Sequence, residues 1–424
     1  MAADLLDLAD RLWRGETDIA DHHPIAGMWG EMAELGHGAA FVAAFSNIAA
    51  FASDEGMVLV DTSSPFLAGR VHDVLQSWRD EPLHTAVFTH GHIDHVFGVE
   101  RYEADARDRG ARAPRVVAHE AVPARFDRYI ATAGYNAAIN RRQFGLDRGF
   151  EWPTEYRYPD ETYGDSMTLD IGGMRFELHH ARGETDDHTW AWLPESRILC
   201  TGDLFIWASP NCGNPQKVQR YPKDWAVALR TMAALGPETL LPGHGLPIVG
   251  ADRVRESLEN TATLLEGLHD DTLRLMNEGA RLDEIIHTVH APQSLLEKPY
   301  LRPIYDEPEF VVRNIWRLYG GWHDGNPAQL KPAPDAAVAR EVATLAGGAA
   351  RLAARALEVA AQGDLRLAGQ LAESAAAAAP DDPDAQRARA EVFEARVGAE
   401  ASTMSKGIFG AAARESREKL DDDR

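Results

Sequence analysis

Short runs of apolar residues, separated by polar or glycine-containing turns, dominate the first 250 positions of the chain. Runs of strand length lie at residues 41–45, 48–51, 57–60, 85–89, 116–118, 198–203 and 239–241. Residues 167–178 alternate around Gly172 and Gly173, which is typical of a β-hairpin. Apolar positions with helical spacing at residues 5–13 and 65–78 predict helices beside these strands. We therefore expect an α/β fold in this part of the chain.

A different pattern begins after Gly250. Strand-like runs stop, alanine becomes frequent, and the spacing of apolar residues predicts helices at residues 268–277 and from residue 282 onward. Helix pairs that end near residue 379 look like tetratricopeptide-type hairpins, although a generic helical bundle has the same pattern. We predict two domains: residues 1–250, which contain the strands, and residues 251–424, which contain helices only.

Charge and cysteine content narrow the class of protein. The chain has 43 Lys and Arg against 66 Asp and Glu, a net charge of −23, which opposes binding to nucleic acid or to an anionic membrane surface. Its two cysteines, Cys200 and Cys212, imply no disulfide framework. There is no basic segment followed by an apolar one at the start and no apolar run of 18 residues, so we expect a cytoplasmic protein without a membrane span.

Four metal-ligand residue types fall within six positions directly after the strand at 85–89: His90, His92, Asp94 and His95. In an extended segment His90 and His92 point the same way, and Asp94 with His95 can then face a second ion. Neutral imidazole and carboxylate are the donors that zinc prefers. A loop of solvated polar residues would explain the composition, but the apolar strand just before it favours a metal site. Asp61, at the end of an earlier strand, is either a turn residue or an acid that holds this loop.

The His-x-His-x-Asp-His pattern resembles the signature of the metallo-β-lactamase superfamily. The resemblance implies that Asp203, at the end of the 198–203 strand, is a carboxylate that bridges two ions. It also implies that His244, in a Pro-Gly turn, is the last histidine ligand. Glu184 follows Gly183 where the superfamily usually has a ligand histidine, and the alkylsulfatase branch has a glutamate ligand at this place. His188 is a core residue, a support for a ligand, or a ligand itself.

Residues 270–279, 298–301 and 319–328 resemble the alkylsulfatase dimerisation region. Together the resemblances run from about Gly36 to the acidic tail. They imply an αββα metallo-β-lactamase sandwich followed by an all-α dimerisation domain. They also imply a homodimer that acts on a small-molecule ester.

The resemblance predicts two Zn²⁺ ions per chain. His90, His92 and Glu184 would bind one ion, Asp94, His95 and His244 the other, and Asp203 would lie between them. Two such ions, about 3.5–4 Å apart, activate a shared water for hydrolysis, so Asp94 and Asp203 are the predicted catalytic residues. The favoured reaction is cleavage of alkyl sulfate esters. Alternatives are hydrolysis of a carboxylic ester, lactone or phosphoester, an iron protein that handles oxygen or thiols, and a metal-free interaction protein.

Two segments supply candidate substrate residues. Residues 120–165 are aromatic-rich and look irregular, so they form either a packed insertion or a cleft wall, and Asn136, Asn140 and Arg141 are their polar candidates. Residues 211–220 correspond to a segment in which alkylsulfatases carry an Arg-Gly-Ala arginine thought to hold sulfate. This chain has no such triplet there, and Lys217 and Arg220 are the basic residues nearest to that register.

Overall fold

The computed structural model describes residues 5–23 and 30–422, in two compact units. The first contains the described residues up to Ala133 together with Pro153–Gly321, and the second contains Gly134–Trp152 and Trp322–Arg424 as far as they are described. The predicted domain boundary was residue 250. The helices between residues 251 and 321 belong to the first unit. The main division between the compact units therefore lies at residue 321, after the change in composition at residue 250.

A seven-stranded sheet forms one half of the first unit, in the order β1-β2-β3-β4-β5-β6-β7. The first four strands form an antiparallel meander, and β4 to β7 run parallel because helical crossovers connect them. Its strands are β1 Glu31–Gly36, β2 Ala39–Ala43, β3 Ile48–Ser53, β4 Gly56–Val60, β5 Leu83–Val87, β6 Arg115–His119 and β7 Glu161–Tyr163.

A six-stranded sheet forms the other half, in the order β13-β12-β11-β10-β9-β8. The predicted hairpin is present as β8 and β9, and Gly172 and Gly173 at its turn have φ of 49° and 80°, which glycine adopts without strain. Its strands are β8 Ser166–Ile171, β9 Met174–His180, β10 Thr189–Leu193, β11 Ile198–Ile206, β12 Thr239–His244 and β13 Ile248–Val249.

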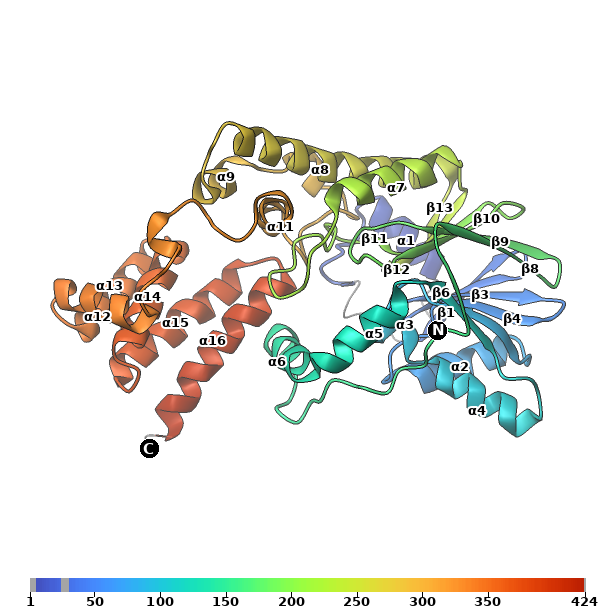
Figure 1. The fold of residues 1–424 in the computed structure, drawn as a ribbon, viewed down its shortest axis with the longest axis horizontal. Helices are drawn as coiled ribbons and strands as arrows, with labels where there is room; N and C mark the ends of the chain where they lie inside the picture. Colours follow the sequence, from blue (N-terminus) through green and yellow to red (C-terminus); the bar gives the residue numbers. More distant parts are fainter. Residues whose placement is uncertain (1–4, 24–29, 423–424) are drawn as a thin grey trace. The chain divides into compact units, whose positions relative to one another are not determined.

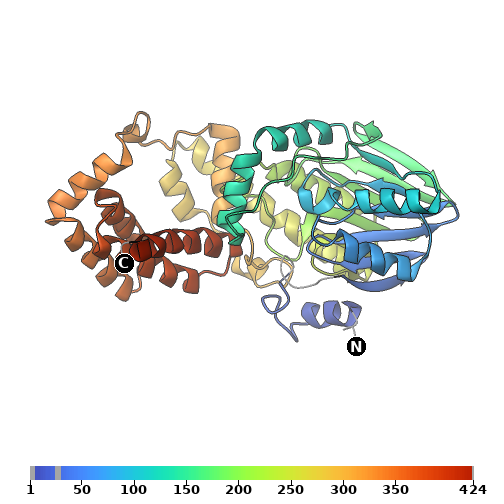
Figure 2. The ribbon, with the colours of Figure 1, turned by 90° about the horizontal axis from the view of Figure 1, so that it is seen from below.

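The two sheets pack face to face with helices outside, which confirms the predicted αββα sandwich (Figure 1). Phe51 of β3 meets Phe176 of β9 edge to face, with ring centroids 5.3 Å apart, in the core between the sheets. Helices α2 (Ala68–Trp78) and α4 (Val99–Arg109) cover the first sheet, as the view from below shows (Figure 2). On the other side, α7 (Pro222–Ala234) packs against the long helix α8 (Ala251–Asn277).

Several shorter helices complete the first unit. Helix α1 (Leu5–Trp13) forms as predicted, and its Leu5, Leu8 and Leu12 are buried. The remaining helices of this unit are α3 Ile93–Val96, α5 Val122–Ala131, α9 Leu282–Thr288, α10 Gln293–Leu296 and α11 Pro308–Gly320. None of the helices in the described residues is both long and apolar enough to span a membrane.

The expectation that residues 120–165 are irregular is wrong for their first half, which forms α5 and α6 (Ala133–Phe144). Val122, Phe126 and Tyr129 are buried on one face of α5. Their spacing of three and four residues is helical, but the high aromatic content of the segment obscured it.

The second unit is all-α, as predicted for the dimerisation region. Its alanine-rich helices pack closely, and Ala372, Ala375 and Ala388 are fully buried. Asp364 and Asp382 cap the helices that follow them by accepting backbone N–H groups. Besides α6 and a short 3₁₀ turn at Pro327–Gln329, the helices are α12 Asp335–Ala346, α13 Ala349–Ala361, α14 Leu365–Ala378, α15 Pro383–Ala399 and α16 Thr403–Asp422.

Candidate metal centre

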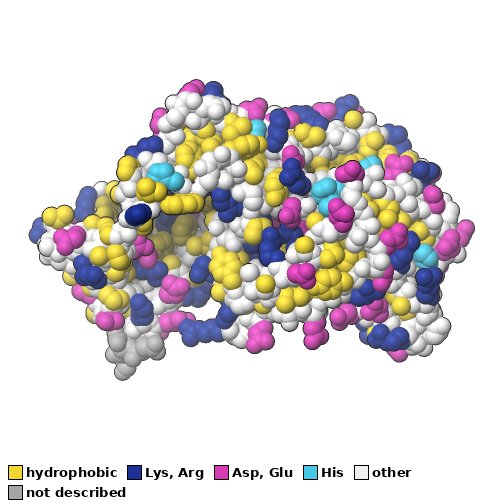
Figure 3. All heavy atoms as spheres, viewed as in Figure 1, with side chains coloured by type: hydrophobic (Ala, Val, Ile, Leu, Met, Phe, Trp, Pro, Cys, Tyr) yellow, Lys and Arg dark blue, Asp and Glu magenta, His cyan; other side chains and the backbone are white. Residues whose placement is uncertain are grey.

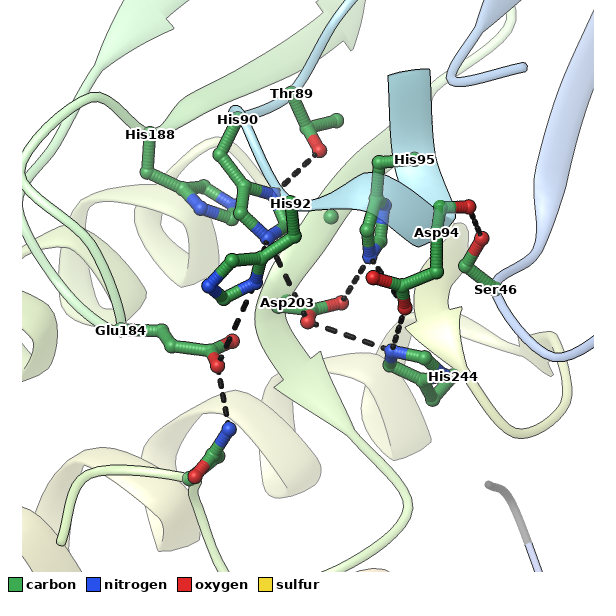
Figure 4. A network of polar contacts seen from close by, with 12 residues as sticks. Ser46, Thr89, His90, His92, Asp94, His95, Glu184, His188, Asp203 and His244 are labelled. Atoms are coloured by element: carbon green, nitrogen blue, oxygen red, sulfur yellow. Dashed lines mark hydrogen bonds and ion pairs between the residues drawn. The ribbon is translucent and has the colours of Figure 1, made fainter. Parts of the chain in front are cut away.

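The seven predicted ligands converge in the first unit, although they come from both sheets (Figure 4). Residues 90–95 follow β5 and open α3, so one short turn presents four donors. Glu184 lies in the loop between β9 and β10, Asp203 lies in β11, and His244 ends β12. Each donor therefore stands on or directly beside a buried strand, which restricts its position.

The first group consists of His90, His92, Glu184 and Asp203, whose donor atoms all lie within 4.8 Å of one another. His90 Nε2 is 2.7 Å from His92 Nδ1 and 3.8 Å from Asp203 Oδ2, and His92 Nδ1 is 3.8 Å from Glu184 Oε1. The side chains of His90 and Glu184 are buried, whereas that of His92 keeps 17% of its surface exposed. One side of this group is thus open to solvent at His92.

The second group consists of Asp94, His95 and His244. Asp94 Oδ2 lies 3.4 Å from His95 Nε2 and 3.5 Å from His244 Nε2. Asp203 also reaches this group, since its Oδ1 is 3.4 Å from His95 Nε2 and its Oδ2 is 3.4 Å from His244 Nε2. The carboxylate of Asp203 therefore faces both groups, the arrangement that a bridging ligand needs.

Hydrogen bonds on the far side of each imidazole fix its orientation. His95 Nδ1 is 2.7 Å from Asp61 Oδ2, and His244 Nδ1–H donates to the carbonyl oxygen of Phe45. In both rings Nε2 is then left to face the centre. Asp61 also accepts the backbone N–H and the hydroxyl of Thr89, and it adopts φ of 64°. Asp61 is therefore the acid that holds the loop, one of the two roles that its position in the sequence allowed.

Burial decides the charge on the histidines of the first group. It lowers the pKa of His90 and of His92 well below the ordinary value, so both are neutral imidazoles with lone pairs to offer. Burial alone would raise the pKa of Asp94, but the adjacent His95 and then His244 lower it to about 2. Burial and the nearby Asp203 raise the pKa of Glu184, so this carboxylate needs a positive partner to stay ionised.

Three buried atoms of this cluster that could ligate a metal have no hydrogen-bond partner among the described residues. They are His95 Nε2, Glu184 Oε2 and Asp203 Oδ1. Buried polar atoms are normally satisfied, and an ion at the centre would satisfy all three. The donors are imidazole nitrogens and carboxylate oxygens, the set that zinc takes up most readily. The residues present therefore fit a pair of divalent ions.

His188 is placed beside the cluster and is in neither group. Its ring stacks on His90 with centroids 4.6 Å apart, and its Nε2 lies 3.2 Å from the carbonyl oxygen of Thr201, to which it can donate. Burial lowers the pKa of His188 to about 4, which keeps the ring neutral. Among the roles left open by the sequence, this geometry favours a support for His90.

Arg220 is buried and turned toward Glu184. Its guanidinium donates to the backbone oxygens of Asn211 and Val218, and NH2 lies 3.4 Å from Glu184 Oε1. The side-chain amide of Asn211 donates to the same carboxylate oxygen. Sequence reasoning missed Asn211, because its contact with Glu184 joins loops that are 27 positions apart.

The loop that carries Asn211 is anchored by a buried acid. Asp306 Oδ2 accepts the backbone N–H of Gly213 at 2.6 Å, and Oδ1 accepts that of Glu307 at 2.8 Å. A Cβ atom at Gly213 would lie 2.2 Å from backbone atoms at Phe310 and Val311, so glycine is required for this approach. Burial raises the pKa of Asp306 to about 7. No motif in the sequence pointed to Asp306, which lies 93 positions from its partner.

The other predicted substrate residues lie in different places. Lys217 is half-buried in the 211–220 loop of the first unit. Asn136, Asn140 and Arg141 lie on α6 in the second unit, where Asn140 donates to the carbonyl oxygen of Asn136 and Arg141 to that of Ala137. The seven clustered donors all lie in the first unit.

Comparison with known proteins agrees with this architecture. The metallo-beta-lactamase superfamily model matches residues 43–244, and the alkyl sulfatase dimerisation model matches residues 281–419. The two matched segments together cover most of the chain, and they follow one another in the predicted order, with the metallo-β-lactamase part before the dimerisation region.

Two relatives are alkylsulfatases by name. A linear primary-alkylsulfatase of a Pseudomonas species is 28% identical over 366 residues, which cover 80% of this chain and 68% of the relative. The alkyl/aryl-sulfatase BDS1 of Saccharomyces cerevisiae is 26% identical over 390 residues, which cover 84% of this chain and 59% of that protein. The chain thus spans about three fifths to two thirds of the length of these relatives.

A solved structure has the same fold. The stereoselective inverting sec-alkylsulfatase Pisa1 from a Pseudomonas species superposes with a TM-score of 0.81 at 24% sequence identity. The match covers 92% of this chain and 66% of that one.

Proposed function

We propose that this protein is a binuclear zinc hydrolase that cleaves sulfate esters of alkyl or related organic alcohols. The observation that carries the proposal is the position of Asp203, whose two oxygens face the histidines of both donor groups. Two Zn²⁺ ions held there would polarise the ester and supply a hydroxide at neutral pH. The relationship to alkylsulfatases favours a sulfate ester over the other substrates.

The protein's own residues prepare the site for that chemistry. Neutral imidazoles at His90 and His92 offer lone pairs, and the carboxylates of Asp94 and Asp203 supply negative charge. Asn211 and Arg220 hold Glu184 through Oε1, which also faces His92, and its Oε2 has no hydrogen-bond partner among the described residues. A carboxylate in place of a third histidine would make an ion held in the first group a weaker Lewis acid, which would suit a leaving group that departs readily.

Lys217 is our candidate for the sulfate group. Burial, and then the nearby Arg220, lower its pKa to about 8, so the ammonium group still carries charge at neutral pH. Arg220 is engaged by Glu184 and by two backbone oxygens, and we therefore assign it to holding Glu184. On this assignment Lys217→Ala should raise KM for an alkyl sulfate more than it lowers kcat, whereas Arg220→Ala should weaken metal binding.

The test is a substrate panel with metal analysis on protein purified without chelator. We expect two zinc ions per chain, hydrolysis of a medium-chain alkyl sulfate, and loss of that activity in Asp203→Ala. Carboxylic esters, lactones and phosphoesters belong in the panel, because the Arg-Gly-Ala arginine of the sulfatases has no counterpart here. Turnover of one of these, with no cleavage of alkyl sulfates, would replace the sulfatase assignment. Active protein with one ion or none would end the binuclear one.

We also propose a homodimer that uses α12. Val338, Val342 and Leu345 lie at helical spacing and are 51%, 36% and 88% exposed, whereas Ala339 and Ala343 on the opposite side are buried. Hydrophobic side chains lie at the surface of the second unit, where Figure 1 places α12 (Figure 3). An exposed apolar stripe within a region that matches a dimerisation model is best covered by a second copy of the chain.

A further inference from the structure

A buried ion pair lies between α5 and the loop that carries Glu184. Arg125 of α5 places its Nε 2.9 Å from Asp187 Oδ2, and its NH2 donates to Asp186. The side chain of Asp187 is fully buried and that of Arg125 is 2% exposed. Removing Arg125 would take away the cation that faces the buried Asp187, and removing Asp187 would leave the buried Arg125 with only the half-exposed Asp186. The two side chains therefore act as one unit.

Asp187 connects this pair to the other ligand loop. Its Oδ2 also accepts the backbone N–H of Gly91 at 3.0 Å, and Gly91 stands between His90 and His92. A Cβ atom at Gly91 would lie 3.0 Å from Arg125 Cδ and 3.2 Å from Asp187 Oδ2. The peptide that separates the two histidines is therefore held against both members of the pair.

Two further contacts run in register with this one. The ring of His188 stacks on His90, and the backbone N–H of Thr189 donates to the carbonyl oxygen of Thr89 at 2.6 Å. Residues 187–189 thus support residues 89–91 one by one. The contacts of residues 187–189 therefore support the loop that carries the histidines of the first donor group. Of residues 89–91, Thr89 also donates to Asp61. The supports of the second group are different, namely Asp61 behind His95 and the Phe45 carbonyl behind His244.

We propose that Asp187 and Arg125 are positioning residues that hold the His90–His92 loop at a set distance from Glu184. The inference rests on the proposed binuclear site, because it assigns these residues to the ion of the first group. Neither ligand loop is regular at these positions, so strand pairing alone does not place His92 against Glu184. The shared carboxylate of Asp187 supplies that constraint through a charge-assisted hydrogen bond.

The test measures the affinity of each ion by chelator competition in the full-length protein. Asp187→Ala should weaken one ion by about tenfold or more, the usual effect of losing a residue that orients ligands, and leave the other at wild-type affinity. Repeating the titration in a His244→Ala background, whose second group is incomplete, assigns the weakened ion. Asp187→Ala should then weaken the ion that remains.

The matched control is Glu103→Ala, which removes a partly buried ion pair away from the ligand loops. In this pair Arg157 Nε lies 2.7 Å from Glu103 Oε1. It should keep both ions at wild-type affinity. If Asp187→Ala does not fold, Asp187→Asn takes its place. It keeps an acceptor for Gly91 but loses the charge that strengthens this bond and pairs with Arg125, so it should weaken the same ion to a smaller extent.

The outcomes separate the two proposals. Two ions in the wild type and unchanged affinities in the Asp187 variants would overturn the positioning role alone, as would equal weakening of both ions. A wild-type protein with fewer than two ions would overturn the binuclear site and the positioning role with it.

Discussion

Asp306 should make the stability of this protein depend on pH between about pH 4 and pH 7, and substitution of Asp306 should remove this dependence. Burial raises the pKa of Asp306 from its ordinary 3.8 to about 7. In the folded protein the carboxyl group therefore keeps its proton up to about pH 7, whereas the unfolded chain loses it near pH 4. The folded state binds more protons between these values, so stability falls as the pH rises through this window.

The magnitude follows from the size of the shift. About three pKa units, at about 1.4 kcal/mol each, set an upper limit of about 4 kcal/mol that is lost between pH 4 and pH 7. Asp306→Asn cannot titrate, but its amide accepts only one of the two N–H groups that the carboxyl group holds. It should therefore be less stable than the wild type at pH 5 by about 1–3 kcal/mol. The difference should shrink or reverse by pH 8.

Urea unfolding of both proteins at pH 5, 6, 7 and 8, in the same chelator-containing buffer, measures this difference. Chelation removes proton release by metal ligands from the comparison, and the remaining ionisable groups are common to both chains. A stability difference between wild type and Asp306→Asn that stays constant within about 0.5 kcal/mol across the series would refute the reasoning, since one pKa unit is worth more than that.

Four further substitutions test other parts of the structure. Asp94→Ala and Asp203→Ala should each reduce hydrolysis to the uncatalysed background with the fold retained. Turnover assays beside circular dichroism check this, and activity within a few-fold of wild type would contradict it. Leu345→Glu should give monomers at micromolar concentration by light scattering, and a persistent dimer would place the interface elsewhere. Gly98→Ala would put a methyl group 1.5 Å from the Thr62 carbonyl oxygen, so it should destabilise the protein by at least about 1–3 kcal/mol; an unchanged Tm would exclude that clash.

Local sequence patterns predicted those strands that are short apolar runs, such as β3, β4, β5 and β6, whereas the sandwich arrangement was implied by the family resemblance. The patterns missed β1, whose residues are mostly half-buried or exposed, and the short strand β7. The 85–89 run and the four polar residues after it are neighbours in the sequence, so their convergence needs no knowledge of the tertiary fold. Glu184, Asp203 and His244 also stand beside recognisable strands, and the structure brings them to the same centre.

Apart from Asp61 and His188, the residues that support the ligands could not be found in this way. Arg125 and Asp186 are 61 positions apart, and Asp306 and Gly213 are 93 apart, so their pairing exists only once separate elements have packed. The residue at which the first compact unit ends could not be read from the sequence for a related reason. Helix α8 has the same helical pattern as the helices of the second unit, and only its packing on α7 shows where it belongs.

The order of the donors along the chain has a consequence for biosynthesis. The first group ends at Asp203, whereas the second group needs His244 at the end of β12. During translation the donors of the first group therefore leave the ribosome before the second group can exist. Asp203 lies in β11, which pairs in parallel with β12, so this strand lacks one neighbour until β12 has been synthesised. On the proposed binuclear site, a nascent chain that takes up metal during synthesis would fill the His90–His92–Glu184 group first, and the second group would be complete only after β12 has formed.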